Sequence, residues 1–237
     1  MMRIVLKEKP KNPTIIEGFP GFGLVGTIST EYLINELKAR PIGSIHAEDI
    51  PPMVAIHESK LVQPIGVYYD DKNNLVMLHV MTNVKGMEWD VGELVLELAK
   101  QLDAKDIVAI EGVGTPMPSE KSDAYFYSNN EQGKKQFASA GIEPLKEGII
   151  LGVTATLILQ GEDRPLSSIF VETHSSLPDS KAAAKAIEVL DKYLGLKIAY
   201  EPLLKQAEKF ESKIKGLMEK SSVATEEQKK KTLSYVG

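Results

Sequence analysis

The feature that most constrains the fold is a glycine-rich stretch near the start of the chain, Glu17–Gly26. A short apolar run, Thr14–Ile16, precedes it, and an amphipathic helical pattern, Ile28–Leu37, follows it. Four glycines and one proline within nine residues predict a tight turn that joins a strand to a helix. Glycine is needed where φ is positive or where the backbone passes close to another group. That group is either a ligand phosphate or another part of the protein.

Three glycines of this turn, Gly21, Gly23 and Gly26, fit the G-x-G-x-x-G fingerprint of dinucleotide-binding proteins. The acidic pair Glu48–Asp49 follows at about the distance where such proteins place a ribose-binding carboxylate. The aromatic and proline residues in the turn, the two prolines after the acidic pair and the lack of a second-half motif weaken this interpretation. We therefore favour a structural or oligomer-contacting turn, made by Gly18, Phe19, Pro20, Gly21, Phe22, Gly23 and Gly26.

The composition is that of an ordinary globular chain. Its 237 residues suffice for one large α/β domain or two small ones, with 43% hydrophobic and 26% charged residues. There is no N-terminal signal pattern and no apolar run long enough to span a bilayer, so we expect a cytoplasmic protein without a membrane partner. The absence of cysteine excludes disulfides, thiol nucleophiles and thiolate metal sites.

The net charge of −5 is unevenly distributed along the sequence. Residues 205–237 contain eight lysines and five acidic residues, a local charge of +3, which leaves −8 for residues 1–204. An acidic body is poorly suited to phosphate backbones, so nucleic acid is not an expected partner. The lysines near the end alternate with glutamates at helical spacing, which is typical of a solvated helix face.

Apolar strands alternate with amphipathic helices along residues 1–200, which predicts an α/β sheet covered on both faces. Thr27 or Ser29 is expected to cap the first helix, and periodicity does not decide whether Leu151–Leu159 is a strand or a helix. Lys197–Tyr200 is a candidate edge strand. The predicted strands are residues 3–7, 14–17, 42–47, 54–57, 63–69, 75–81, 106–111, 124–127 and 168–172; the predicted helices are residues 30–39, 89–102, 131–140 and 179–194.

The sequence changes character after Pro202. An apolar stripe between Leu203 and Met218 lies on an otherwise charged helical pattern, with no predicted sheet left to cover it. Such a helix either folds back on the domain or pairs with another subunit. We therefore expect a core domain over residues 1–200, followed by a C-terminal helix and a mobile tail over residues 201–237. The uncovered stripe, together with the aromatic residues of the glycine turn, predicts a homo-oligomer.

Familiar catalytic and metal-binding motifs are missing from the sequence, and the four histidines are too scattered to indicate a metal site. The segment Glu172–Ser176 and the strand end Glu111–Gly114 were considered as catalytic sites, because α/β proteins place such sites at the carboxyl ends of strands. We interpret Glu172–Ser176 as capping or loop hydrogen bonding, and His79 as a hydrogen-bonded core histidine. For Glu111 the alternatives stay open: a ribose-binding carboxylate, a base, or equally a cap of the next turn. No catalytic residue and no cofactor are predicted.

Several motifs in order resemble the proteasome assembly chaperone family, in particular its archaeal homologues. They are the string Gly18–Gly26, the segment Gly152–Leu157, the pair Glu172–Thr173, and Pro178–Asp179 before an alanine-rich helix. The resemblance implies a three-layer α/β/α fold similar to that of nucleoside phosphorylases but without their catalytic residues. It further implies a non-enzymatic, ATP-independent assembly scaffold of four or five subunits. Its expected partners are further copies of itself and the proteasome core particle or a related paralogue.

The end of the chain departs from the pattern of this family. Family members carry a docking arm that ends in a hydrophobic residue, a tyrosine and any residue, whereas this chain ends in Leu233, Ser234, Tyr235, Val236 and Gly237. Tyr235 is third from the end and follows a serine, so we expect docking through these five residues to be weak. Two interpretations stay open, a disordered tail and an altered docking or regulatory tail. The alternative function is a nucleotide- or nucleoside-processing enzyme that uses the loop Gly21–Gly26.

Overall fold

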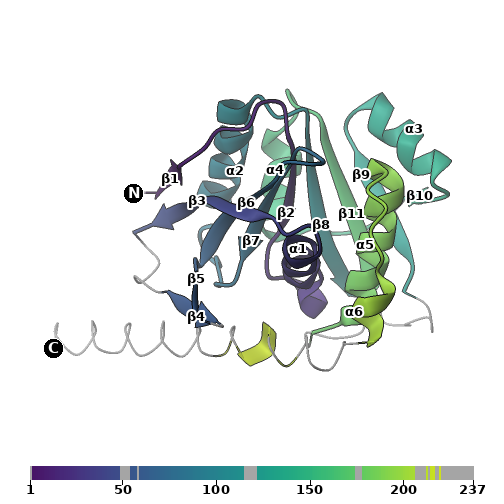
Figure 1. The fold of residues 1–237 in the computed structure, drawn as a ribbon. Coiled ribbons are helices and arrows are strands. Elements are labelled where there is room, and N and C mark those ends of the chain that lie inside the picture. Colours follow the sequence, from purple (N-terminus) through teal and green to yellow (C-terminus); the bar gives the residue numbers. More distant parts are fainter. Residues whose placement is uncertain are drawn as a thin grey trace, which may run out of the picture.

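The computed structural model describes residues 2–48, 54–57, 59–114, 122–173 and 178–205, and further along residues 212, 214–216 and 219. In this part of the chain a nine-stranded mixed sheet forms the middle layer, and helices cover both of its faces (Figure 1). The predicted three-layer α/β/α architecture is therefore confirmed. The predicted likeness to nucleoside phosphorylases stays a prediction.

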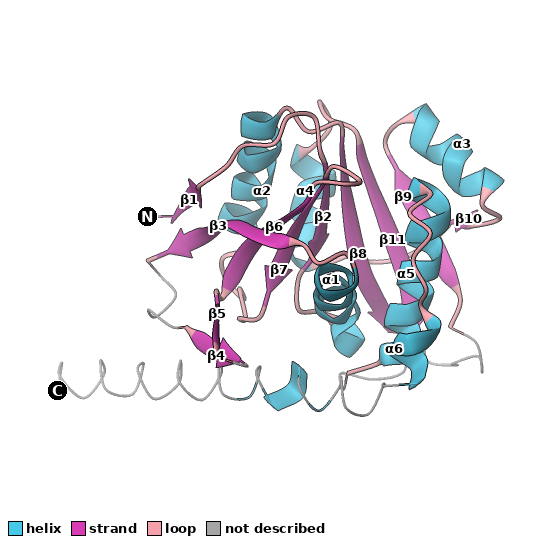
Figure 2. Cartoon of the chain, in the orientation of Figure 1, coloured by secondary structure: helices cyan, strands magenta, loops and turns pink. Residues whose placement is uncertain are grey.

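The strands follow the order β1-β3-β6-β7-β2-β8-β11-β9-β10 across the sheet (Figure 2). Their bounds in that order are Met2–Leu6, Arg40–Ala47, Ile65–Asp70, Leu75–Val80, Thr14–Gly18, Asp106–Gly114, Leu166–Thr173, Ala124–Ser128 and Glu143–Pro144. A separate hairpin consists of β4 (Ala55–His57) and β5 (Lys60–Val62). The helices are α1 (Val25–Glu36), α2 (Glu88–Leu102), α3 (Glu131–Ser139), α4 (Gly152–Gln160), α5 (Ser180–Leu194) and α6 (Glu201–Lys205), and the short 3-10 turn η1 (Phe22–Leu24) precedes α1.

The four central strands β7, β2, β8 and β11 run parallel to one another and are buried on both faces. Adjacent residues of β2 therefore enter different cores. Ile15 packs in the core beneath α2 and α4, whereas Ile16 packs in the core beneath α1 and α5. Because β2, β8 and β11 are parallel, they end at one edge of the sheet, which we call the carboxyl edge. The glycine turn leaves β2 at this edge.

Helix α1 begins at Val25, earlier than the predicted start at Thr30. Leu24 before it has a left-handed φ of 48°, so the chain turns and enters the helix within the glycine-rich stretch. The predicted cap residues Thr27 and Ser29 therefore lie inside α1. Their hydroxyls donate to carbonyl groups of β7 and α5, so the prediction that either residue caps the helix is wrong.

Three further boundaries differ from those expected or resolve an open choice. Strand β8 continues through the predicted turn Gly112–Pro116 as far as Gly114, because it pairs with β11 along its whole length. The run Leu151–Leu159 forms helix α4 after its first residue. The predicted edge strand Lys197–Tyr200 is wrong: this segment is irregular, and one of its carbonyl groups accepts a 2.7 Å hydrogen bond from the hydroxyl of Tyr32.

The C-terminal stripe between Leu203 and Met218 is partly covered by the domain itself. Leu203 and Ile214 are each 1% exposed and belong to the core beneath α1 and α5, whereas Leu204 is 43% exposed. Of the two alternatives for the stripe, folding back on the domain is therefore the one that holds for Leu203 and Ile214. The division of the chain after residue 200 stays a prediction. The other stripe residues, Ala207, Phe210, Leu217 and Met218, lie outside the described residues.

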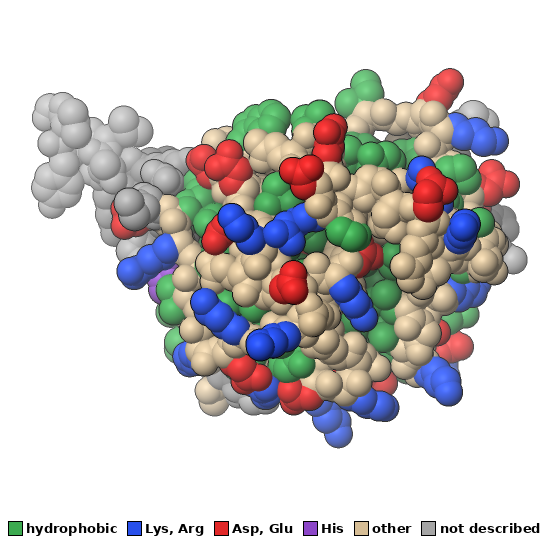
Figure 3. All heavy atoms as spheres, turned by 90° about the horizontal axis from the view of Figure 1, so that it is seen from above, with side chains coloured by type: hydrophobic (Ala, Val, Ile, Leu, Met, Phe, Trp, Pro, Cys, Tyr) green, Lys and Arg blue, Asp and Glu red, His purple; other side chains and the backbone are tan. Residues whose placement is uncertain are grey.

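Figure 3 looks onto the end of the molecule opposite the carboxyl edge, where β2, β8 and β11 begin. Basic and acidic side chains are interspersed over this face, so the part of it that the structure describes presents a mixed charge rather than a basic surface for phosphates. Within the described residues, no helix combines the length and the apolar character that crossing a membrane requires.

Candidate functional site

The glycine turn packs closely against the protein itself. A Cβ atom on Gly18 would meet the carbonyl group of Gly26, and a Cβ on Gly26 would lie 2.5 Å from the carbonyl oxygen of Ile110. Gly23 has a φ of 63° and lies against Thr173, so its conformation and its packing both disfavour a side chain. The close approaches of these glycines are therefore to other elements of the chain, the alternative to a ligand that the sequence left open.

Two glutamates lie beside the turn on the face of the sheet that α4 covers. Glu17 at the end of β2 is fully buried, and Glu111 in β8 is partly buried. Both contact the hydroxyl of Thr154 in the first turn of α4, at 3.3 Å from Glu17 Oε1 and 2.9 Å from Glu111 Oε2. The other oxygen of Glu111 lies against Gly21, where a Cβ atom would collide with it. The two carboxyl groups therefore meet between α4 and the glycine turn.

A proton must be shared at this cluster, because a hydroxyl group has one proton and donates one hydrogen bond. If Thr154 donates to Glu111, at the shorter distance, its contact with Glu17 is a hydrogen bond only when Glu17 is itself protonated. The remaining oxygen of Glu17, Oε2, has no hydrogen-bond partner in the described part of the chain. One proton shared with Thr154 therefore links the two carboxyl groups, and no described cation lies beside them to form an ion pair.

The electrostatic environment agrees with this proton count. Burial and, second, the negative charge of Glu111 together raise the pKa of the Glu17 carboxyl to about 8, against a lowering by the Thr154 hydroxyl and the Phe19 backbone N–H. Burial also raises the pKa of Glu111 to about 7, against a lowering by the Thr154 hydroxyl. At least one carboxyl of the pair is therefore protonated near neutral pH.

The position of Glu111 argues against phosphate binding at this turn. In dinucleotide-binding proteins the pyrophosphate lies against the glycine-rich turn at the start of the helix. Here the carboxyl group of Glu111 lies against Gly21, on the turn that a phosphate would have to approach. Phosphate oxygens would therefore face carboxyl oxygens, which are acceptors and become negative on ionisation. The G-x-G-x-x-G spacing is therefore present, but the carboxyl group of Glu111 beside Gly21 makes the turn unsuitable for binding a phosphate.

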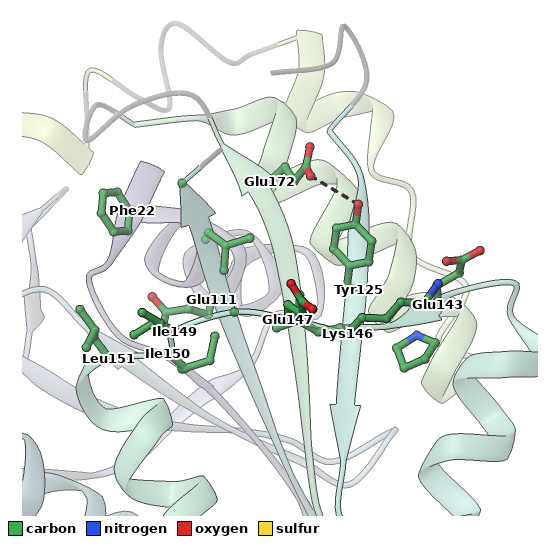
Figure 4. Close-up of a pocket in the computed structure, with 16 residues that line it drawn as sticks. Phe22, Glu111, Tyr125, Glu143, Lys146, Glu147, Ile149, Ile150, Leu151 and Glu172 are labelled. Atoms are coloured by element: carbon green, nitrogen blue, oxygen red, sulfur yellow. Dashed lines mark hydrogen bonds between the residues drawn. The ribbon is translucent and has the colours of Figure 1, made fainter. Parts of the chain in front are cut away.

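Glu111 also lines a cavity of about 630 Å³ at the carboxyl edge, over β8, β9 and β11 (Figure 4). The segment from β10 to the start of α4 crosses in front of these strands and forms one wall, while Phe22 of the glycine turn lies on another side. The hydroxyl of Tyr125 donates to Glu172 Oε1 at 3.4 Å across the cavity. The lining residues used below are Phe22, Glu111, Tyr125, Glu143, Lys146, Glu147, Ile149, Ile150, Leu151 and Glu172.

Large apolar side chains are exposed around this cavity and around an adjoining hollow of about 330 Å³. Ile149 is 87% exposed and Leu151 is 72% exposed, although both are large aliphatic residues. The two hollows share the wall made by the segment before α4. We call the group the rim surface; it consists of Phe22, Tyr127, Ile149, Leu151 and Leu159.

The residues of the predicted turn divide between core and surface. Phe19 is 5% exposed and packs in the core beneath α2 and α4, so the expectation that it is bare at the turn is wrong. Pro20 is half-buried, and Phe22 is 53% exposed. Only Phe22 of the two aromatic residues is thus available for contact with another molecule.

Other residues singled out from the sequence lie apart from this cluster or outside the described residues. The predicted core histidine is confirmed: His79 is 1% exposed, with Nδ1 at 3.0 Å from the Thr30 hydroxyl and Nε2 at 3.1 Å from Glu31 Oε2. The hydroxyl of Thr173 donates to Asp179, which caps α5, as the capping interpretation of this strand end predicts. The remaining candidates, Asp49, His174, Ser175, Ser176 and Leu233–Gly237, lie outside the described residues.

Sequence reasoning missed Glu17 and Thr154 as site residues. Glu17 was included as the end of a strand and the first residue of the glycine-rich stretch, although a charged residue in an otherwise apolar, buried strand is itself a signal. Thr154 belongs to the run whose secondary structure the periodicity did not decide. Once that run is a helix, its first turn faces the ends of β2 and β8.

Comparisons with known proteins agree with this fold. The structure resembles the crystal structure of PbaA from Pyrococcus furiosus, described as an archaeal homolog of proteasome-assembly chaperone, with a TM-score of 0.85 and 30% identity over 94% of this chain and 99% of that chain. PbaB of the same organism, described as an archaeal proteasome activator, shares the fold with a TM-score of 0.75 and 24% identity over 91% and 98% of the two chains. An uncharacterised protein of Methanocaldococcus jannaschii is 25% identical over 242 residues, which cover 99% of this chain and 98% of the relative.

The model of the PAC2 family matches residues 15–218, which include the glycine turn, the carboxyl pair and α4. The resemblance to archaeal proteasome assembly chaperones that the sequence motifs indicated is confirmed. This chain belongs to the PAC2 family.

Proposed function

We propose that this chain is a non-enzymatic, ATP-independent assembly chaperone that self-associates and binds the proteasome core particle. The observation that carries the proposal is the rim surface at the carboxyl edge. Large aliphatic side chains that are more than half exposed line two adjoining hollows there. Contiguous apolar surface of this kind marks interaction sites in soluble proteins.

The family relatives support the proposed chaperone function. PbaA is described as an archaeal homolog of proteasome-assembly chaperone, and its similarity extends over nearly the whole of both chains. PbaB is described as a proteasome activator. A shared fold alone does not fix function, so the proposal relies on the rim surface of this chain for the site of contact.

A binding role also fits the chemistry of the glycine turn better than nucleotide processing does. The turn is closed by Glu111, Thr173 and the β8 backbone, and the group beside Gly21 is a carboxyl. The exposed Phe22 then projects from a turn that packing holds in place. In this proposal the turn presents an aromatic side chain to a second subunit.

The first test is the mass of the purified full chain at micromolar concentration. We expect four or five copies of the 26.0 kDa chain in one particle. A monomeric mass would overturn the self-association part of the proposal, whatever the protein binds in addition.

The second test concerns the last five residues, Leu233–Gly237. Three forms of the chain are compared for binding to purified proteasome core particle: the unmodified chain, a chain without these five residues, and a chain that lacks Gly237 and carries Ser234→Leu. The last form ends in Leu-Leu-Tyr-Val and restores the family's spacing of hydrophobic residue, tyrosine and terminal carboxylate. We expect the restored form to bind more tightly than the unmodified chain. If the unmodified chain binds tightly and loses binding only on truncation, the shifted motif is not weak.

A further inference from the structure

The carboxyl pair reaches the 630 Å³ cavity through Glu111, with Glu17 buried behind it, and no described basic side chain forms an ion pair with either glutamate. Glu17 is 0% exposed, its carboxyl is turned toward Thr154 and Glu111, and its Oε2 atom has no hydrogen-bond partner among the described residues. A buried carboxyl oxygen without a partner costs free energy. The single proton of the pair reduces this cost, and a cation held at Glu111 would remove it further.

Glu111 connects the buried pair to the cavity, because its side chain belongs to both. The mouth of the cavity continues the same sign of charge. Among the described lining residues the acidic ones outnumber the basic ones, since Glu143, Glu147 and Glu172 accompany Glu111 while Lys146 is the one basic side chain. A cleft lined by one sign of charge raises the local concentration of the opposite ion.

The walls of the cavity select for more than charge. Phe22, Ile150 and Leu151 supply apolar surface, and Tyr125 supplies an aromatic ring on the far side. The volume of about 630 Å³ lies within the range of small-ligand pockets. A ligand that fits both features carries a cationic group on an apolar or aromatic body.

We propose that this cavity binds an ammonium or guanidinium group carried on an apolar body, with Glu111 as its counter-ion and Glu17 behind it. The same chemistry occurs in free amines and in lysine or arginine side chains of a peptide. Binding replaces the shared proton of the carboxyl pair, so the proton leaves to solvent as the cation enters. This inference does not depend on self-association.

The test uses calorimetric titration of the full chain with tyramine, which carries an ammonium group on an aromatic ring. Its matched controls are 4-ethylphenol, which lacks the charge, and 4-hydroxyphenylacetate, which carries the opposite charge. A second arm uses a peptide with the sequence of Lys229–Gly237, which contains three lysines and Tyr235. Binding of tyramine identifies a free amine as sufficient, and binding of the peptide alone identifies a basic peptide as the source. Either result supports the site if the two control compounds bind at least about tenfold more weakly than the cation.

Two variants place the binding at the carboxyl pair. Glu111→Gln removes the counter-ion while keeping the side-chain shape, and we expect it to weaken binding by about 30-fold or more, as for other desolvated charge pairs. Glu147→Gln makes the same chemical change at an exposed position of the same cavity and should weaken binding by only a few-fold. Equal weakening in both variants would show that general surface charge holds the ligand and would overturn the proposal.

A measurement on the unmodified chain keeps the inference testable if Glu111→Gln does not fold. Titrations at about pH 7 in two buffers of different ionisation enthalpy report the protons released on binding. We expect a net release, because the cation displaces the shared proton. No binding of tyramine or of the peptide at about 1 mM, or binding without proton release, would contradict the proposal. The titratable groups that face the pair or the cavity, and whose protonation this measurement includes, are Glu17, Glu111, Tyr125, Glu143, Lys146, Glu147 and Glu172.

Discussion

Strand β8 carries a buried carboxyl group toward each end, and the protein treats the two groups differently. Asp106 at the start of the strand accepts a 2.7 Å hydrogen bond from the hydroxyl of Tyr193. That hydroxyl is 3.2 Å from Ser167, which is in turn 3.2 Å from Ser128. At the other end Glu111 shares one hydroxyl with a second carboxyl, that of Glu17. At one end a single acid accepts from a hydroxyl that belongs to a chain of hydroxyl groups, although Asp106 Oδ1 has no hydrogen-bond partner among the described residues. At the other end one hydroxyl serves two acids.

The difference separates an end whose carboxyl group is tied into the fold from an end whose carboxyl group adjoins a cavity. The chain of hydroxyl groups that begins at Tyr193 continues through Ser128 of β9 to Asn130, whose side chain caps α3. It therefore connects strand β9 to helix α3. The glutamate pair instead adjoins a cavity, an exposed aromatic residue and the rim surface. Burial raises the pKa of both kinds of site, and at the glutamate end the titratable group Glu111 also lines a cavity. A perturbed carboxyl indicates function when a place for a ligand accompanies it.

The largest expected effect comes from the glycine turn that closes the glutamate end. Gly23→Val places a β-branched side chain at a φ of 63° and against Thr173, so we expect a loss of about 3–5 kcal/mol in the free energy of unfolding. Gly141→Val is the matched control, since Gly141 has a similar φ of 74° but nothing within 4 Å of its Cβ position. Chemical denaturation should show the smaller loss for Gly141→Val. Equal losses would mean that conformation alone, without the close packing, makes the turn sensitive.

Gly21→Val tests the same turn at the carboxyl pair. A side chain there collides with Glu111, and we expect damage to folding or assembly rather than to a catalytic rate. A variant that stays folded and assembled yet loses a measurable turnover would reverse the ranking of the scaffold and enzyme hypotheses.

The next effect is the dependence of stability on pH, which should differ between the two ends. The folded-state pKa of Glu17 is about 8, above the reference value of 4.5, so its contribution is fully present below about pH 4.5 and is lost as the pH rises through about 8. For Asp106 the corresponding values are 3.8 and about 6, so its loss is complete at lower pH. Each pKa unit corresponds to about 1.4 kcal/mol, which makes the expected total a few kcal/mol.

Two variants separate these contributions. Between about pH 6 and 9 the unmodified chain should lose stability, Glu17→Gln should flatten the curve, and Asp106→Asn should leave its slope unchanged. Urea denaturation at a series of pH values gives the curves. A flat curve for the unmodified chain, or equal flattening by both variants, would contradict the assignment of this pH dependence to the glutamate end.

The sequence predicted features that depend on local patterns, but not those that depend on contacts between distant elements. The strands around Ile15 and Ile110 are continuous apolar runs, so their place in the middle of a covered sheet could be read directly. The glycine turn was also predicted, because a tight turn with a positive φ and close backbone approaches requires glycine. The pairing of Glu17 with Glu111 could not be predicted, since it depends on α4 returning over the ends of β2 and β8. The burial of Phe19 was missed for the same reason, because distant elements cover it. For Ile214 the stripe pattern left burial against the domain and contact with another subunit open, and the structure shows burial.

The smallest expected effect is the response to nucleotides. If the carboxyl beside Gly21 disfavours phosphate, thermal unfolding should be unchanged across a panel of nucleosides, nucleotides and dinucleotides. A true ligand at 100 times its Kd would stabilise the native state by about 2.7 kcal/mol. Stabilisation of that size by a nucleotide, lost in Gly21→Ala, would favour the enzyme hypothesis over the scaffold.

The central claim is that the carboxyl edge is where this chain meets its own copies, and one matched pair of variants tests it most directly. Leu159 belongs to the rim surface and is 63% exposed, and Leu61 lies on the separate β4–β5 hairpin and is 61% exposed. The same change to serine at either position removes a similar apolar surface. We expect native mass measurement at micromolar concentration to give four or five subunits for the unmodified chain and for Leu61→Ser, and smaller species for Leu159→Ser. A monomeric unmodified chain, or dissociation by Leu61→Ser alone, would contradict the account.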